Sequence, residues 1–144
     1  MASASTTRLV AAPVEAVWRV LADFGAISRW GTGVDQSSML SEGPVGLGST
    51  RRVQVGRNTL RETITAWEPQ SRLGYTLIGL PPVVREATNT WSLAAEGTGT
   101  AVTLTSVVRT KGGPVLAHVV IGRLGKAGKQ LVDGLAQHLN GATP

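Results

Sequence analysis

The chain has 144 residues, of which 42% are apolar and only 16% are charged, and it carries a net charge of +5. This length and composition favour a single globular domain spanning residues 1–144 and argue against a disordered or coiled-coil protein. The absence of cysteine excludes disulfide bonds and thiolate metal ligands, and no stretch reaches the ~18–20 apolar residues that a membrane-spanning helix needs.

The first part of the chain predicts a strand followed by two helices. Residues 5–12 favour a strand that ends before Pro13. Pro13 suits the first turn of a helix, and Glu15 complements the positive end of the helix dipole. Apolar residues then recur at helical spacing, and Gly25 is expected to end this helix before a second, short one over 26–30.

The middle of the chain predicts strands separated by short turns. The expected strands are 34–41, 49–56, 59–67, 72–79, 84–95 and 100–110. The segments between them are rich in residues that turns prefer, and the strand segment AVTLTSVV (101–108) alternates apolar with polar side chains. Consecutive strands joined by short turns predict an antiparallel meander.

The last segment predicts one long amphipathic helix over 114–139. Its apolar arc is formed by Leu116, Val120, Leu124, Leu131 and Leu135. The helix also contains Gly122, Gly125 and Gly128, although each glycine in a helix interior costs about 0.5–1 kcal/mol relative to alanine. These glycines therefore call for a structural explanation.

This order of elements resembles the helix-grip fold, an α+β architecture. More closely, the chain is similar to polyketide cyclase/dehydrase-type members of the START-like (SRPBCC) superfamily. The residues that carry the resemblance are APVEAVWRVLADFGAISRW (12–30), VGLGSTRRV (45–53), LRETITAWEPQSRLGYTL (60–77) and GGP (112–114). The resemblance implies a curved antiparallel sheet of seven strands around the long C-terminal helix, with two short helices after the first strand. It also implies a pocket for an apolar or amphipathic small molecule between sheet and helix.

Two explanations of the helix glycines follow from this expected pocket. Gly128 falls within the apolar face, Gly125 near its boundary and Gly122 on the polar arc. Either the sheet packs tightly against Gly128, as protein interiors usually do, or the missing side-chain volume is cavity volume. Neither explanation applies to Gly122.

Alternation along the strands identifies candidate ligand-binding residues. Four polar side chains are expected to interrupt an apolar wall and orient a ligand: Glu62, Tyr75, Arg85 and Asn89. The other candidates are Trp30, Val53, Val55, Ile64, Leu77, Trp91, Leu104, Leu124, Gly128 and Leu131. The same alternation turns Arg51 inward, and the resemblance places the loop 79–84 at the opening.

Each polar candidate also has a purely structural interpretation. Glu62 and Arg85 lie two strands apart in the family's strand order, so they can form a buried ion pair. Tyr75 can be a core tyrosine with a satisfied hydroxyl group, whereas Asn89 is harder to explain structurally because asparagine is depleted in strand interiors. Trp18 and Trp67 are expected in the core, and Trp30 either there or at the pocket mouth.

The sequence shows no motif for metal, nucleotide or triad chemistry. The two histidines, His118 and His138, are twenty residues apart on one predicted helix, about 30 Å at 1.5 Å per residue, so they cannot share a metal ion. Neither GLGST nor GRLGKAG fits a phosphate-binding loop, and no nucleophile elbow is present. We expect no metal and no cofactor.

The expected function is therefore the binding or transport of a hydrophobic or amphipathic small molecule, lipid-like or polyketide-like. The alternative is a polyketide aromatase/cyclase or dehydratase that uses Arg85, Tyr75 and Glu62 in the same cavity, by orientation and acid–base chemistry. A third possibility is an interaction module with a vestigial cavity. The arginines are scattered, which argues against a nucleic-acid partner. We expect a cytoplasmic monomer or homodimer without stable membrane insertion.

Overall fold

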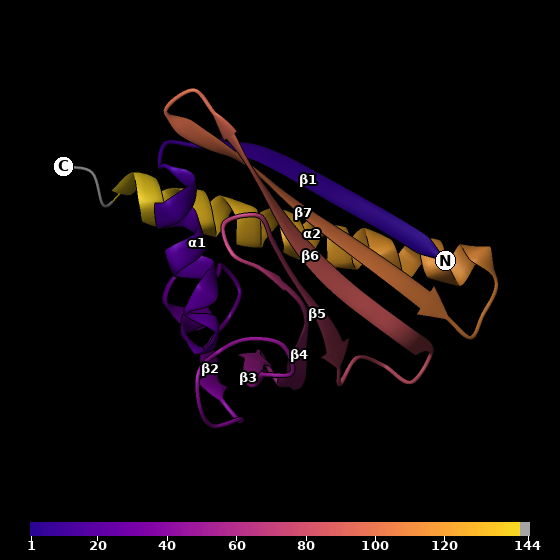
Figure 1. Ribbon diagram of the computed structural model, residues 1–144. Helices are drawn as coiled ribbons and strands as arrows, with labels where there is room; N and C mark the ends of the chain where they lie inside the picture. The colour runs from indigo at the N-terminus through magenta and orange to yellow at the C-terminus, as the bar shows by residue number, and fades with distance from the viewer. Residues whose placement is uncertain (142–144) are drawn as a thin grey trace.

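Seven antiparallel strands form one sheet, and a long C-terminal helix runs across one of its faces (Figure 1). The computed structural model describes residues 1–141. In chain order the elements are β1 (Ala2–Val10), α1 (Val14–Ala22), the 3₁₀ helix η1 (Phe24–Arg29), β2 (Gln36–Met39), β3 (Thr50–Val55), β4 (Asn58–Glu68), β5 (Arg72–Ile78), β6 (Val84–Glu96), β7 (Gly99–Thr110) and α2 (Pro114–Gly141). The α+β helix-grip prediction is confirmed.

The strand order explains how the helices are placed. The order across the sheet is β1-β7-β6-β5-β4-β3-β2, so β1 and β2 are the two edge strands although they are neighbours in sequence. Helices α1 and η1 form the connection from one edge to the other, at one end of the sheet (Figure 1). From β2 onward each strand pairs with the next, which is the predicted meander.

The predicted boundaries agree with the structure to within one or two residues at most elements. The largest difference is at β1, which was predicted over 5–12 but spans Ala2–Val10. Its first residues, ASAS, lack the β-branched and aromatic side chains that indicate strands, and pairing with β7 extends the strand over them. The short helix predicted over 26–30 is η1, which begins earlier, at Phe24.

Two register shifts interrupt the regular alternation of the sheet. One lies between Ile64 and Ala66 in β4, and beyond it the alternation changes face. Trp67 consequently packs on the core, where its ring meets the Trp18 ring edge-on at 5.0 Å between centroids. The predicted core positions of both tryptophans are thus confirmed. The second shift lies between Val84 and Glu86 in β6.

Candidate functional site

A cavity of about 450 Å³ lies between the sheet and the middle of α2. The strands contribute Val53, Val55, Asn58, Leu60, Glu62, Tyr75, Leu77 and Asn89; the helix contributes Leu124, Ala127, Gly128, Gln130 and Leu131; and Ile27, Thr32–Val34 and Gly79–Pro82 complete the wall. Cavities that bind small molecules typically measure roughly 300–1,000 Å³ and are mostly apolar with a few convergent polar groups. This cavity fits that description.

The cavity has a buried floor and an exposed rim. Glu62, Tyr75 and Asn89 are buried on the floor, together with Val53 and Gly128. The rim residues are mostly exposed and come from four segments: the loop 79–82, the segment 32–33, the β3–β4 hairpin at Val55 and Asn58, and the exposed side of α2. The polar floor therefore lies behind apolar walls, and a ligand would enter past the rim. The predicted place of the 79–84 loop at the opening holds for residues 79–82.

Gly79 sets the course of this rim loop. It has a φ of +111°, and a Cβ there would lie 2.5 Å from the Thr59 carbonyl oxygen. A residue with a side chain would be strained by the backbone angle and would also collide with β4. Glycine thus lets the chain leave β5 close to its neighbour and then turn through Pro81 and Pro82.

Nine of the fourteen residues predicted from the sequence line this cavity. They are Val53, Val55, Glu62, Tyr75, Leu77, Asn89, Leu124, Gly128 and Leu131. Four others are buried behind the wall: Trp30, Ile64, Trp91 and Leu104. Trp30 is not at the mouth, because its ring packs edge-on against Trp91 at 5.7 Å between centroids.

Arg85 does not point into the cavity, and this prediction is wrong. The residue is exposed and lies at the register shift between Val84 and Glu86, so the alternation that holds for Ala87, Asn89 and Trp91 does not extend to it. The proposed ion pair between Glu62 and Arg85 is therefore also wrong. Glu62 does form a buried ion pair, but with a different arginine.

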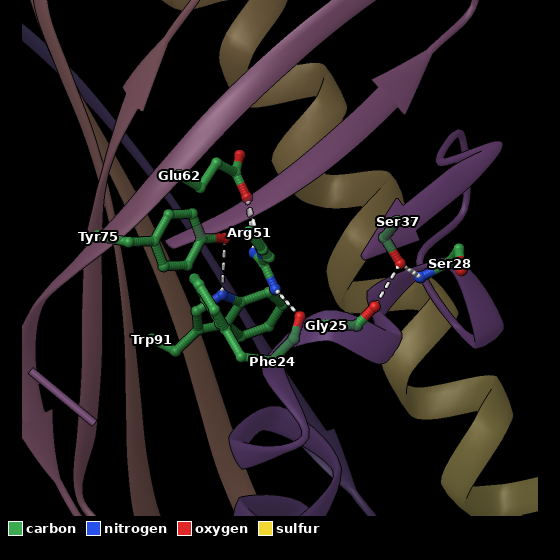
Figure 2. Close-up of polar contacts among 8 residues, drawn as sticks. All are labelled: Phe24, Gly25, Ser28, Ser37, Arg51, Glu62, Tyr75 and Trp91. Atoms are coloured by element: carbon green, nitrogen blue, oxygen red, sulfur yellow. Dashed lines mark hydrogen bonds and ion pairs between the residues drawn. The ribbon is translucent and has the colours of Figure 1, made fainter. Parts of the chain in front are cut away.

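Arg51 on β3 is the partner of Glu62. Its Nε donates to Glu62 Oε1 at 2.8 Å, and its Nη2 forms an ion pair with the same oxygen at 2.7 Å. Its Nη1 donates to the Phe24 carbonyl oxygen at 2.8 Å (Figure 2). The guanidinium carbon also lies 3.7 Å from the ring centroid of Phe24 and 4.7 Å from that of Tyr75. The arginine is thus fully engaged, and it does not line the cavity.

The sequence predicts the Arg51–Glu62 pair when the strand register is counted from the hairpin turn between β3 and β4. Val55 pairs with Asn58, so Gly56 and Arg57 form a two-residue hairpin turn. Counting outward from that turn places Arg51 directly opposite Glu62. Register counted from the turn would therefore have added Arg51 to the site and assigned the partner of Glu62.

The structure holds the Phe24 carbonyl in place through β2. Ser37 Oγ donates to the Gly25 carbonyl oxygen at 2.7 Å and accepts the backbone N–H of Ser28 at 3.0 Å (Figure 2). These two bonds tie η1 to the edge strand. The backbone of η1 is thereby fixed next to the arginine that it binds.

Tyr75 joins the ion pair to the aromatic core. Its hydroxyl oxygen accepts the indole N–H of Trp91 at 3.2 Å, and its ring meets that of Phe24 edge-on (Figure 2). Burial raises the pKa of Tyr75 above its ordinary value of 10.0, and the negative charge of Glu62 raises it further; Arg51, Trp91 and Asn89 act in the opposite direction. Tyr75 is therefore a protonated hydrogen-bond donor at neutral pH.

Asn89 is held by a bond from the neighbouring strand. Ser106 Oγ donates to Asn89 Oδ1 at 2.6 Å, and both residues are buried. With Oδ1 engaged, the amide nitrogen is the group of Asn89 that faces the Tyr75 hydroxyl group, where it lowers the pKa of Tyr75. This bond explains how a strand interior accommodates asparagine.

The glycines of α2 have different surroundings. Gly128 lines the cavity, and a Cβ there would make ordinary contact with Leu104 at 3.4 Å. A Cβ at Gly125 would meet Ala4 at 3.1 Å, whereas one at Gly122 would meet nothing within 4 Å. Gly134, one turn past Leu131, lies so close to the Trp30 carbonyl oxygen and to Thr32 that a Cβ would overlap them. Close approach thus explains Gly134, and cavity volume is the explanation that fits Gly128.

Within residues 1–141, no cluster of three or more potential metal ligands is present, and no helix is both long and apolar enough to cross a bilayer.

The sequence matches, over residues 1–140, the family described as polyketide cyclase/dehydrase and lipid transport. The chain belongs to this family. No curated protein matches it in sequence. Solved structures with the same fold cover 96–99% of the chain.

Three solved structures illustrate this similarity. A START superfamily protein from Mycobacterium smegmatis has a TM-score of 0.82 at 20% identity, covering 98% of this chain and 99% of its own. A protein from Thermobifida fusca gives 0.83 at 22%, covering 99% and 96%. ZhuI aromatase/cyclase from Streptomyces sp. R1128 gives 0.80 at 18%, covering 96% and 93%. At these identities the likeness concerns the fold.

Proposed function

We propose that this protein binds a hydrophobic or amphipathic small molecule, lipid-like or polyketide-like, in the cavity between the sheet and α2. The observation that carries the proposal is a cavity of about 450 Å³ with apolar walls, an exposed rim and three buried polar residues on its floor. Close-packed interiors rarely retain voids of this size without a purpose. The size of the cavity also argues against the third possibility, an interaction module whose cavity is vestigial.

The state of the arginines favours binding over catalysis. The enzymatic alternative needs a cationic group in the cavity to polarise a carbonyl, and Arg85 was the candidate. Arg85 lies outside, and Arg51 is engaged by Glu62, the Phe24 carbonyl and two aromatic rings. Among the described residues that line the cavity, none is cationic. The remaining polar groups suit recognition of a ligand.

Two measurements test this function. Mass spectrometry of an organic-solvent extract of the purified protein is expected to reveal a co-purifying apolar compound. A neutral fluorescent probe, N-phenyl-1-naphthylamine, is expected to bind with one site per chain. A Leu60→Trp variant, which fills the cavity from β4, should lose probe binding.

The matched control places the same side chain elsewhere. Leu9 is 59% exposed on β1 and is no part of the cavity wall, so Leu9→Trp should bind the probe as the unaltered protein does. Circular dichroism establishes that both variants fold. Probe binding that survives in a folded Leu60→Trp variant would contradict the proposed site, and Leu77→Phe offers an independent way to narrow the same cavity.

A further inference from the structure

The ion pair under the cavity is oriented, with its negative partner toward the ligand. Glu62 lines the cavity and Arg51 does not. Arg51 Nε and Nη2 both lie against the same carboxylate oxygen, Oε1. Within residues 1–141, Oε2 receives no hydrogen bond, and Figure 2 shows it pointing away from the arginine. Within the same residues, Trp30 Nε1 is the only buried side-chain nitrogen or oxygen without a partner, so Oε2 keeps access to the cavity. A ligand group in the cavity can therefore donate a hydrogen bond to this charged oxygen.

Tyr75 complements this acceptor with a donor. Its hydroxyl oxygen accepts a bond from Trp91, which leaves its own hydrogen available, and the residue lines the same floor. Its burial keeps the phenol protonated. The floor of the cavity therefore presents an acceptor, Glu62 Oε2, and a donor, the Tyr75 hydroxyl, to whatever group reaches it.

We infer that this floor binds a neutral hydroxyl group at the polar end of an otherwise apolar ligand, with Glu62 Oε2 accepting its hydrogen and Tyr75 donating to its oxygen. The inference rests on the proposed function, because it names the class of ligand that the same cavity takes. Alcohols and phenols belong to that class. The amide nitrogen of Asn89 can supply a second bond to the same oxygen.

The two charged alternatives match the floor less well. A carboxylate would bring its negative charge against Glu62, whose neutralising arginine lies on the far side. An ammonium group would satisfy Glu62, but it has no lone pair to accept the Tyr75 hydrogen, and it must lose its hydration in a mostly apolar cavity. A hydroxyl group both donates and accepts, and it carries no charge.

The test uses three probes of equal chain length: 1-decanol, decanoate and decylammonium. Each competes with N-phenyl-1-naphthylamine at neutral pH. The three probes also differ in their free energy of transfer from water. The ratios of their binding affinities are therefore compared with those of the double variant Arg51→Met/Glu62→Leu. This variant removes both charges at similar volume, a replacement that buried ion pairs often tolerate.

In each protein the affinity for decanol is divided by the affinity for decanoate. This ratio should be at least about tenfold higher in the unaltered protein than in the double variant, because one hydrogen bond to a charged group has an effect of that size. Decanol should also bind more tightly than decylammonium. The single variant Glu62→Gln, which leaves Arg51 unpaired, should gain affinity for decanoate. Glu68→Gln removes a carboxylate from the same strand, in an exposed pair with Arg72, and should change no preference.

Each outcome tests either the hydroxyl assignment or the proposed small-molecule binding itself. Equal preferences in the unaltered protein and the double variant, or tighter binding of decanoate or decylammonium than of decanol, would overturn the hydroxyl assignment while leaving the cavity function intact. If neither the fluorescent probe nor any of the three compounds binds, the proposed function itself fails. If Glu62→Gln does not fold, the double variant and Tyr75→Phe still decide. Tyr75→Phe should weaken the binding of decanol and leave that of decylammonium unchanged, because an ammonium group cannot accept the Tyr75 hydrogen.

Discussion

The end and the middle of α2 meet the sheet in different ways. Beyond Leu131 the helix is closely packed, with Val132, Leu135 and Ala136 fully buried and Gly134 against the backbone of Trp30 and Thr32. Between Leu124 and Leu131 it borders the cavity instead. Before Leu124 the helix is packed again, with Ala117 buried and Ile121 in a buried cluster with Ala87 and Val108. Close packing on both sides therefore fixes the helix and supports the unfilled space between them.

The largest expected effect is at the floor of the cavity, where Glu62 pairs with Arg51. Replacing Arg51 by Met leaves an uncompensated buried carboxylate, which should lower the free energy of unfolding by about 3–5 kcal/mol. The side chains of this pair are 2% and 6% exposed, whereas those of Arg72 and Glu68 are 52% and 51% exposed. Arg72→Met should therefore cost less than about 1 kcal/mol. Urea unfolding of both variants measures the difference, and equal losses would refute a special role for the buried pair.

Truncating one leucine in the packed end of α2 and one beside the cavity tests whether the two segments differ in packing. Leu135→Ala removes a fully buried side chain and should destabilise the protein by about 2–5 kcal/mol. Leu124→Ala removes a half-buried side chain that already borders the cavity, and should cost about 1 kcal/mol. Thermal or urea unfolding gives both values. If Leu124→Ala costs as much as Leu135→Ala, the middle of α2 is packed as tightly as its end.

The fold was predictable because it depends on local periodicity. Alternation in β7 and helical spacing in α2 are visible in single segments, and such patterns predicted the order of elements. Alternation also predicted the inward faces of β3–β6 as far as the register shifts in β4 and β6. The site was only partly predictable. The shift at Arg85 depends on how β6 pairs with β7, and the partner of Glu62 depends on register counted from the turn at Gly56. Whether a glycine leaves space or allows contact depends on what faces it, which no single segment reveals.

Gly134 gives the sharpest test of the packed end of α2. A Cβ at this position would overlap backbone atoms of Trp30 and Thr32, which cannot rotate away. Gly134→Ala should therefore destabilise the protein by about 1–3 kcal/mol, the usual effect of overpacking, even though alanine favours helices. Urea unfolding measures this loss. A stabilised Gly134→Ala variant would show that α2 can move away from this segment at little cost.

Tyr75 provides a spectroscopic test of the cavity floor, because it is the only tyrosine of the chain. Its pKa is raised in the folded state, chiefly by burial, so the folded protein holds the phenolic proton more tightly than the unfolded chain. Its contribution to stability is therefore complete below pH 10 and is lost as the pH rises through the folded-state pKa. Phenolate absorbance should appear above pH 10 together with unfolding, and near pH 10 in denaturant. Reversible ionisation near pH 10 with intact tertiary structure would contradict the buried hydroxyl.

The smallest effects separate the two explanations of the helix glycines. Alanine at Gly122, where a side chain would meet nothing within 4 Å, should stabilise the protein by about 0.5–1 kcal/mol and leave probe binding unchanged. Alanine at Gly128 meets Leu104 only at ordinary contact distance, so a similar gain is expected. Its methyl group, however, occupies part of the cavity, and probe affinity should fall by about fourfold, the equivalent of one buried methylene. Urea unfolding and probe titration of both variants give the two quantities. If Gly128→Ala is destabilising and leaves binding unchanged, its glycine serves packing, and the space between α2 and the sheet at this point is smaller than the cavity requires.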